Sequence, residues 1–144
     1  MANDVKITVT ESGGRKRASS GSAWEPKVGY SRAVRVGSTI AITGTVGVNA
    51  DGTFPKTVAE QTRRALQIIQ AAIEALGGKI EDVVRTRMFV TDISQWEAVG
   101  AVHGEIFGSI RPATTMVEVS RLIAPEILVE IEADAIIQEE DSGP

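Results

Sequence analysis

Five charged side chains fall on two alternating segments of the sequence and can meet on one surface. Glu130, Glu132 and Asp134 alternate with apolar residues, and Arg85 and Arg87 are likewise two residues apart. Residues two apart lie on the same face of a β-strand, so each segment predicts a row of charges. Such a mixed face favours contact with another subunit through ion pairs, and a plain solvent-facing sheet is the alternative.

His103 is the only histidine of the chain, which excludes motifs that bind a metal through paired histidines. Its imidazole can exchange protons or hydrogen-bond a ligand near neutral pH, and it can equally be a packed helix side chain. The chain has no cysteine, which excludes disulfides, thiolate nucleophiles and cysteine-based metal centres. We therefore expect no metal site.

Length and composition are those of one globular domain, and we expect a single domain over residues 1–144. Fifteen basic and nineteen acidic residues give a net charge of −4, which argues against a nucleic-acid binder with a broad basic face. The sequence begins without a secretory h-region and has no apolar run long enough to span a membrane. We therefore expect a cytoplasmic protein with no nucleic-acid or membrane partner.

The periodicity of the sequence predicts an α+β domain of order β-β-β-α-β-α-β-β, with one mixed sheet and two helices packed on one face. Residues 1–29 are expected to form an N-terminal strand and a loop, and 138–144 a frayed acidic tail. Capping boxes at Thr57 and Ser94 predict the two helix starts. The predicted strands cover 5–9, 33–36, 39–43, 80–92, 113–119 and 128–137, the predicted helices follow the two capping boxes as far as 76 and 107, and 11–23 is predicted as a solvated loop.

The predicted faces of the sheet follow from residue parity. The helices are expected to cover the face that carries Val117, Val129 and Ile131. In the strand at 80–92, the alternation places four residues on the face opposite to Arg85, Arg87 and Phe89: Val84, Thr86, Met88 and Val90. The opposite face then carries these five charged residues and Glu118. It also carries Met116 and Phe89, which are large for a wholly solvated surface.

Six segments, read in order, resemble the Rid (YjgF) family of reactive-intermediate deaminases. The resemblance runs from Tyr30 to Ile137, and VEV followed by VEIEA is its most specific part. It implies a chorismate-mutase-like fold and a homotrimer with sheets facing inward, helices facing outward and ligand clefts between subunits. The six segments are GYSRA at 29–33, ITG at 42–44, VVRTRMFVTD at 83–92, RPA at 111–113, VEV at 117–119 and VEIEA at 129–133.

The resemblance also implies an activity: hydrolysis of imines or enamines to a keto acid and ammonia, without metal or organic cofactor. The family's water-activating glutamate falls on Glu130, its pocket tyrosine on Tyr30, and a small hydroxyl residue near the ligand on Thr43. The alternative for Glu130 is one acid in an ion-pair network with Arg85 or Arg87.

The chain departs from the family's imine deaminases at three positions, as a divergent branch would. Thr114 stands where the family has a substrate-binding arginine, Gly100 where it has an asparagine, and Met116 where it has a cysteine. A threonine lacks the charged fork that a carboxylate prefers. Two other residues are hypothesised to compensate: Arg87 by binding the anion, and His103, one turn after Gly100, by reaching the space of the asparagine.

Each of these hypotheses has a structural alternative, in which Arg87 neutralises a neighbouring acid and His103 is a packed side chain. Trp24 and Glu25, just before Tyr30, are candidates to wall the cleft, and the alternative is that Trp24 pins the long N-terminal loop to the domain. We expect a Rid-like homotrimer that binds a small imine, enamine or carboxylate and deaminates it through Glu130. The alternative is a non-catalytic metabolite-binding or regulatory trimer. A nuclease is disfavoured by the charge and the single histidine.

Overall fold

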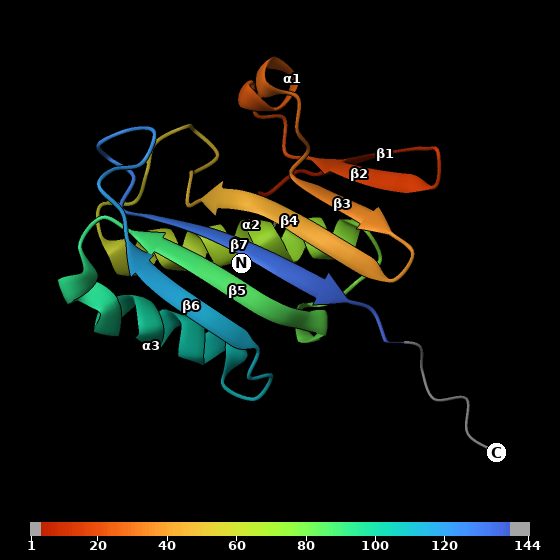
Figure 1. Ribbon diagram of the computed structural model, residues 1–144. Coiled ribbons are helices and arrows are strands. Elements are labelled where there is room, and N and C mark those ends of the chain that lie inside the picture. The colour runs from red at the N-terminus through yellow and green to blue at the C-terminus, as the bar shows by residue number, and fades with distance from the viewer. Residues whose placement is uncertain (1–3, 139–144) are drawn as a thin grey trace.

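A mixed sheet covered on one face by two helices forms the protein in this computed structural model, which describes residues 4–138 (Figure 1). The predicted fold class is thereby confirmed. No helix of the described residues is long and apolar enough to cross a membrane. The strands are β1 (Thr8–Ser12), β2 (Arg15–Ser19), β3 (Ala33–Val36), β4 (Thr39–Val46), β5 (Val83–Val90), β6 (Ala113–Glu118) and β7 (Val129–Ile136), and the helices are α1 (Trp24–Val28), α2 (Val58–Ala75) and α3 (Trp96–Phe107).

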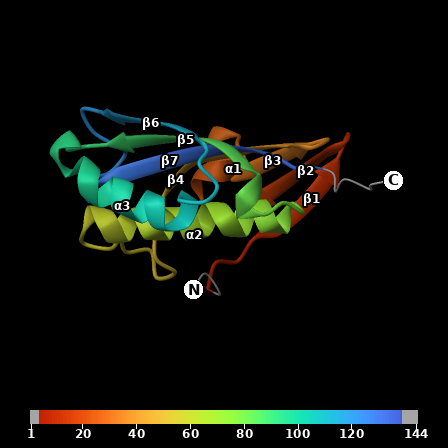
Figure 2. The ribbon, with the colours of Figure 1, turned by 90° about the horizontal axis from the view of Figure 1, so that it is seen from below.

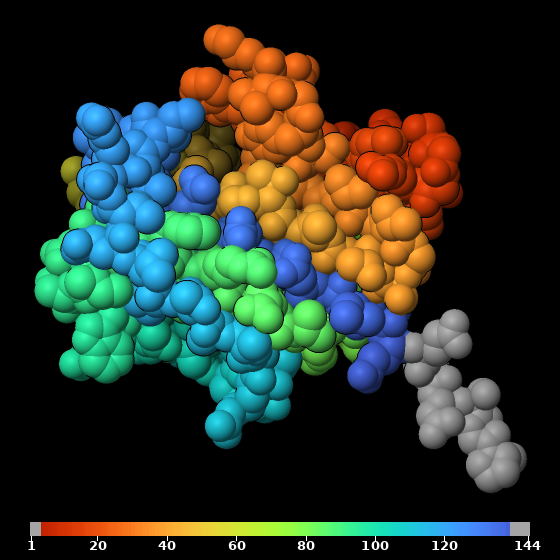
Figure 3. Space-filling model, in the orientation of Figure 1, coloured from red at the N-terminus to blue at the C-terminus, as the bar shows by residue number. Residues whose placement is uncertain are grey.

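The sheet has the strand order β1-β2-β3-β4-β7-β5-β6. β5 and β6 pair in parallel, and every other neighbouring pair is antiparallel. Helices α2 and α3 lie side by side under one face (Figure 2). No helix of residues 4–138 covers the other face, and Figure 3 views this face directly. We call this surface the open face.

Helix α2 begins where the sequence predicts it, because the Thr57 hydroxyl accepts a hydrogen bond from the backbone amide of Glu60 at 3.2 Å. Its apolar stripe, which includes Ala65, Ile69 and Ile73, is fully buried against the sheet. The second helix start differs from the prediction. Asp92, not Ser94, accepts the capping bond in a 3-10 turn over Ile93–Gln95, and α3 follows that turn.

The N-terminal segment was wrongly predicted as a strand and a solvated loop. The first strand begins at Thr8, residues 15–19 form a second strand, and residues 24–28 form the short helix α1. β2 pairs with both β1 and β3, and Ala18 is completely buried on the helix side. The run of basic residues from Arg15 to Arg17 lacks the alternation of apolar and polar residues that predicts a strand, so β2 was not predicted.

The predicted face of β6 was also wrong. β6 runs parallel to β5 with Thr114 opposite Thr86 and Met116 opposite Met88, and the β5 partners are buried towards the helices. Thr114, Met116 and Glu118, which pairs with the buried Val90, therefore lie on the helix side, and Val117 lies on the open face. β6 is the edge strand and is largely exposed on both sides. Its pattern of apolar residues therefore does not indicate which side faces the helices.

A register shift in β5, between Val83 and Arg85, changes which valine enters the core. Val83 is buried and Val84 is 43% exposed, although parity with Thr86 placed Val84 in the core. Beyond the shift the prediction holds, with Arg87 and Phe89 on the open face and Thr86, Met88 and Val90 buried.

Candidate functional site

A hollow of about 440 Å³ lies on the open face. It contains three of the predicted site residues: Tyr30, Thr43 and Arg87. These residues come from the loop before β3, from β4 and from β5, so the hollow depends on the folded sheet. Its lining is completed by Arg15, Arg17, Gly29, Ser31, Val34, Ala41, Ile42, Glu132 and Asp134.

Glu130 lies beside this hollow, next to a register shift between β4 and β7 at residues 42–45. Gly44 occupies the shift, and a Cβ atom at this position would lie 2.5 Å from Glu130 Oε2 and 3.1 Å from its Cδ. The carboxylate therefore packs directly on the glycine backbone. A glycine inside a strand is typical of such a close approach.

The surroundings of Glu130 favour its protonated form. Burial is the main cause and raises its pKa above the ordinary value, and the negative charge of Glu132 acts in the same direction. The positive charge of Arg32 acts against them and lowers the pKa. The net shift is upward, which moves this carboxyl closer to the pKa of an effective base near neutral pH.

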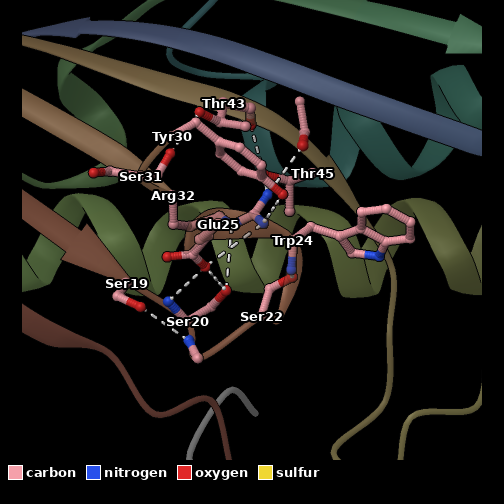
Figure 4. A network of polar contacts seen from close by, with 12 residues as sticks. Ser19, Ser20, Ser22, Trp24, Glu25, Tyr30, Ser31, Arg32, Thr43 and Thr45 are labelled. Atoms are coloured by element: carbon pink, nitrogen blue, oxygen red, sulfur yellow. Dashed lines mark hydrogen bonds and ion pairs between the residues drawn. The ribbon is translucent and has the colours of Figure 1, made fainter. Parts of the chain in front are cut away.

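Arg32 is buried behind the site and connects its parts (Figure 4). Its Nη1 donates to the Gly44 carbonyl at 3.0 Å and to Thr45 Oγ1 at 3.3 Å, so the guanidinium holds the irregular stretch of β4. Its Nη2 donates to the Tyr30 hydroxyl at 3.5 Å. One buried cation thus fixes both Gly44, against which Glu130 packs, and the pocket tyrosine.

Glu25 supplies the negative charge that a buried arginine requires. Its Oε2 lies 3.8 Å from Arg32 Nη2 and accepts hydrogen bonds from the amide and the hydroxyl of Ser20, at 3.2 and 2.8 Å. Glu25 therefore pins the N-terminal loop to the domain. Trp24 points away from this network, is 48% exposed and does not line the hollow (Figure 4).

Thr43 and Arg87 are both engaged within the chain. Thr43 Oγ1 donates to the Ser31 carbonyl at 2.7 Å. Arg87 Nη1 donates to Glu132 at 3.3 Å and to Asp134 at 3.2 Å. Arg87 therefore neutralises neighbouring acids, which is the structural alternative to the hypothesis that it binds an anion.

The other predicted site residues lie on the helix side of the sheet. His103 Nε2 is 2.9 Å from Thr86 Oγ1, and Thr86 Oγ1 donates to Thr114 Oγ1 at 2.7 Å. This chain of hydrogen bonds leads from a buried imidazole to an exposed threonine on the edge strand. His103 packs against Phe107 with ring centroids 4.5 Å apart, and burial lowers its pKa.

The eight predicted residues thus form two groups on opposite faces of the sheet. The open-face group is Glu130, Tyr30, Thr43 and Arg87, and the edge group is Gly100, His103, Thr114 and Met116. Met116 packs against the core, and a Cβ at Gly100 would meet no atom within 4 Å. One chain does not bring the two groups together.

The sequence did not indicate the roles of three residues of the site: Arg32, Glu25 and Gly44. Arg32 and Gly44 lie in segments that carried the family resemblance, but neither was given a function. The interruption of the β4 pattern by Gly44 was a usable signal, since a glycine in a strand often marks a bulge. The pairing of Glu25 with Arg32 depends on the path of the loop between them, so no local sequence pattern predicts it.

The family model described as Endoribonuclease L-PSP matches residues 20–137. The chain therefore belongs to this family, which is the YjgF/Rid family. The match begins after β2, so the β1–β2 hairpin lies outside the matched part.

Three similar proteins place the chain within the family. A Mycobacterium tuberculosis protein, Rv2704, described as a member of the highly conserved YjgF/YER057c/UK114 family, matches with a TM-score of 0.80 and 53% identity, covering 85% of this chain and 99% of its own. The 2-iminobutanoate/2-iminopropanoate deaminase of Escherichia coli K12 is 36% identical over 111 residues, covering 74% of this chain and 86% of its own. The structure of Escherichia coli TdcF with bound serine matches with a TM-score of 0.71 and 27% identity, covering 76% and 88% of the two chains.

Proposed function

We propose that this protein is a homotrimeric, cofactor-independent deaminase that hydrolyses small imines or enamines in clefts between its subunits. The observation that carries the proposal is the position of Glu130, a half-buried carboxylate with a raised pKa that packs on Gly44 beside a hollow containing Tyr30 and Thr43. The likeness to an imine deaminase over most of both chains supports the same activity.

The proposed reaction requires one oriented water and one base. Glu130 takes a proton from the water as the water oxygen bonds to the carbon of the C=N group, and the nitrogen takes a proton from the solvent to give a carbinolamine. Glu130 then returns its proton to the nitrogen, and the C–N bond breaks as the hydroxyl gives its proton to the solvent. A keto compound and ammonia leave. No redox partner is consumed.

The proposed trimer explains why the two groups of site residues lie on opposite faces of the sheet. A symmetric trimer can place the β6 edge of one subunit against the open face of the next, which would bring Thr114 and Gly100 towards the neighbour's Tyr30 and Glu130. The unpartnered open face, which carries Val117 and Phe89 among its charges, supports such a contact.

The proposal is tested by an imine-hydrolysis assay in which imino acids are generated by an amino-acid oxidase and keto-acid formation is followed. We expect the wild type to accelerate hydrolysis and Glu130→Gln to lose about a hundredfold or more, as is typical for a general base. Glu105→Gln, which changes an exposed helix residue paired with Arg63, is the control and should retain the rate. No acceleration by the wild type with any imino acid of a broad panel, or full activity of Glu130→Gln, would refute the proposal.

A non-catalytic metabolite-binding trimer is the second candidate, and Thr114 is the observation that favours it. Its hydroxyl is held by Thr86 and offers no charge to a carboxylate at the position where the family's imine deaminases have an arginine. Ligand binding without hydrolysis, unchanged in Glu130→Gln, would support this second function.

The description of the family as an endoribonuclease suggests a third activity, which the charge of the chain does not favour. A net charge of −4 gives no broad attraction to phosphates. We expect no retention on heparin at low salt.

A further inference from the structure

Arg32 and Glu130 both lie against the backbone of Gly44. Arg32 Nη1 donates to the Gly44 carbonyl at 3.0 Å, and a Cβ atom at Gly44 would lie 2.5 Å from Glu130 Oε2. A positive charge near a carboxylate lowers the pKa of the acid, and Arg32 acts in this direction on Glu130. A direct ion pair between the two side chains would therefore make Glu130 a weaker base.

The two side chains do not form that ion pair. Among residues 4–138, the only carboxylate within 4.0 Å of the Arg32 guanidinium is that of Glu25. Glu25 Oε2 lies 3.8 Å from Arg32 Nη2, and the two side chains are only 6% and 9% exposed. Opposite charges attract more strongly where water is excluded, so Glu25 compensates much of the Arg32 charge.

Neutral partners fix the guanidinium in this position (Figure 4). Its Nε donates to the Ser20 hydroxyl at 3.3 Å, and Nη2 donates to the Tyr30 hydroxyl at 3.5 Å. Ser20 also donates to Glu25 through its amide and its hydroxyl, so one residue orients both members of the ion pair. Arg32 therefore cannot turn towards Glu130 without breaking several hydrogen bonds.

The other charged groups around Glu130 have a different effect or are bound elsewhere. The residues opposite Glu130 on β4 and β5 are apolar. Glu132, on the same strand, raises the pKa of Glu130 by its negative charge. Arg87 is bound to Glu132 and Asp134 in exposed pairs that water screens. Among the described residues, Arg32 is thus the cation that acts on Glu130.

We propose that Glu25 is a positioning residue of the reaction, which holds the Arg32 guanidinium away from Glu130 and so preserves Glu130 as the base. This inference rests on the proposed function, because it concerns the control of the base in that reaction. Glu25 does not line the hollow and acts through Arg32. A buried ion pair is costly to desolvate, and control of the neighbouring Glu130 gives this one a function.

The proposal is tested by NMR titration of the Glu130 carboxyl carbon in the full chain and by the pH dependence of imine hydrolysis. In Glu25→Gln the uncompensated Arg32 should move the Glu130 titration, and the acidic limb of kcat/KM, to lower pH. The rate above that limb should fall about threefold to tenfold, because a weaker base accepts the proton less readily. Glu105→Gln is the matched control: it removes the carboxylate partner of the exposed Arg63 and should leave both curves unchanged.

A second variant keeps the test decisive, because Glu25→Gln leaves a buried charge without its partner and should be less stable. Glu25→Gln/Arg32→Gln removes both charges. With the cation gone, Glu130 should titrate at higher pH than in the wild type, and a structural disturbance alone would not reverse the direction of the shift. A wild-type titration of Glu130 in this double variant would overturn the proposal, as would an unchanged titration in a folded Glu25→Gln.

The two proposals fail differently. If imines are hydrolysed through Glu130 and neither variant moves its titration, the deaminase stands and the role of Glu25 falls. If the titration moves in the two expected directions and no imine is hydrolysed, the control of Glu130 by Glu25 stands and the deaminase falls.

Discussion

The open-face group and the edge group differ in both charge and burial. The open-face group surrounds Glu130, whose pKa is raised mainly by burial and also by the neighbouring Glu132, against the lowering effect of the buried Arg32. The edge group contains a neutral chain of hydrogen bonds from His103 through Thr86 to Thr114. Groups suited to proton transfer and anion attraction are thus concentrated on the open face, whereas the edge offers a fixed hydroxyl.

The two groups are also stabilised in different ways. The open-face group is held by a buried ion pair, Glu25 with Arg32, which is costly to desolvate and strongly destabilising to break on one side only. The edge group is held by hydrogen bonds to one fully buried hydroxyl, that of Thr86. Substitutions at Glu130 and Gly44 on the open face should therefore act mainly on the rate, whereas loss of the Thr86 hydroxyl should act mainly on stability.

The largest effect is expected from Gly44→Ala, which tests whether the Glu130 position matters. The new Cβ would overlap Glu130 Oε2, so the carboxylate must move, while the flexible end of that side chain allows the fold to persist. Because displacement by about 1 Å can cost about a hundredfold in rate, we expect hydrolysis to fall about that much. A Gly44→Ala variant that is folded by circular dichroism and fully active would contradict the role of this contact.

Thr86→Val should mainly affect stability. It leaves His103 Nε2 and Thr114 Oγ1 without their common partner, and the free energy of unfolding should fall by about 1–3 kcal/mol. Thr115→Val is the control, because Thr115 is exposed on the neighbouring strand and faces the open side. Denaturant unfolding of both variants measures the difference, and equal stability of the two would show that the hydrogen-bonded chain contributes nothing.

Much of the fold followed from local patterns, and much of the site did not. The helix periodicity at 58–76 and the alternation at 129–136 predicted α2, β7 and the open-face charges correctly. The contact of Glu130 with Gly44 depends on a register shift between strands distant in sequence, which no local pattern encodes. Whether Arg87 pairs with neighbouring carboxylates or binds an anion could not be predicted from the sequence either. The answer depends on the pairing of β5 with β7.

A smaller effect is expected from the charge of Glu130 itself. Burial raises its folded-state pKa, so folding becomes less favourable as the pH rises from the ordinary value through the raised one, and this loss persists at neutral pH. Glu130→Gln removes the loss. The variant should therefore be more stable than the wild type at pH 7, with the difference vanishing below about pH 4. Unfolding curves that show lower stability of Glu130→Gln at pH 7 would contradict the assigned direction.

The smallest effect is expected at Gly100. It lies inside α3, and among the described residues a methyl group there would meet no atom within 4 Å beyond its chain neighbours and the nearby helix backbone. Gly100→Ala should raise the free energy of unfolding by about 0.5–1 kcal/mol, because alanine is the better helix former. A loss of stability would mean that the space beside Gly100 is filled in the assembled protein.

The most direct test of a shared site asks whether the two groups meet between subunits. Glu130→Gln and Thr114→Glu, which blocks the edge group with a carboxylate, are each expected to be inactive alone. Mixed trimers refolded from equal amounts, with mixing verified by native mass spectrometry, should recover about a quarter of the wild-type rate, because one cleft in four joins an intact open face to an intact edge. Mixed trimers that stay as inactive as the separate variants, or a fully active Thr114→Glu, would contradict a site shared between subunits.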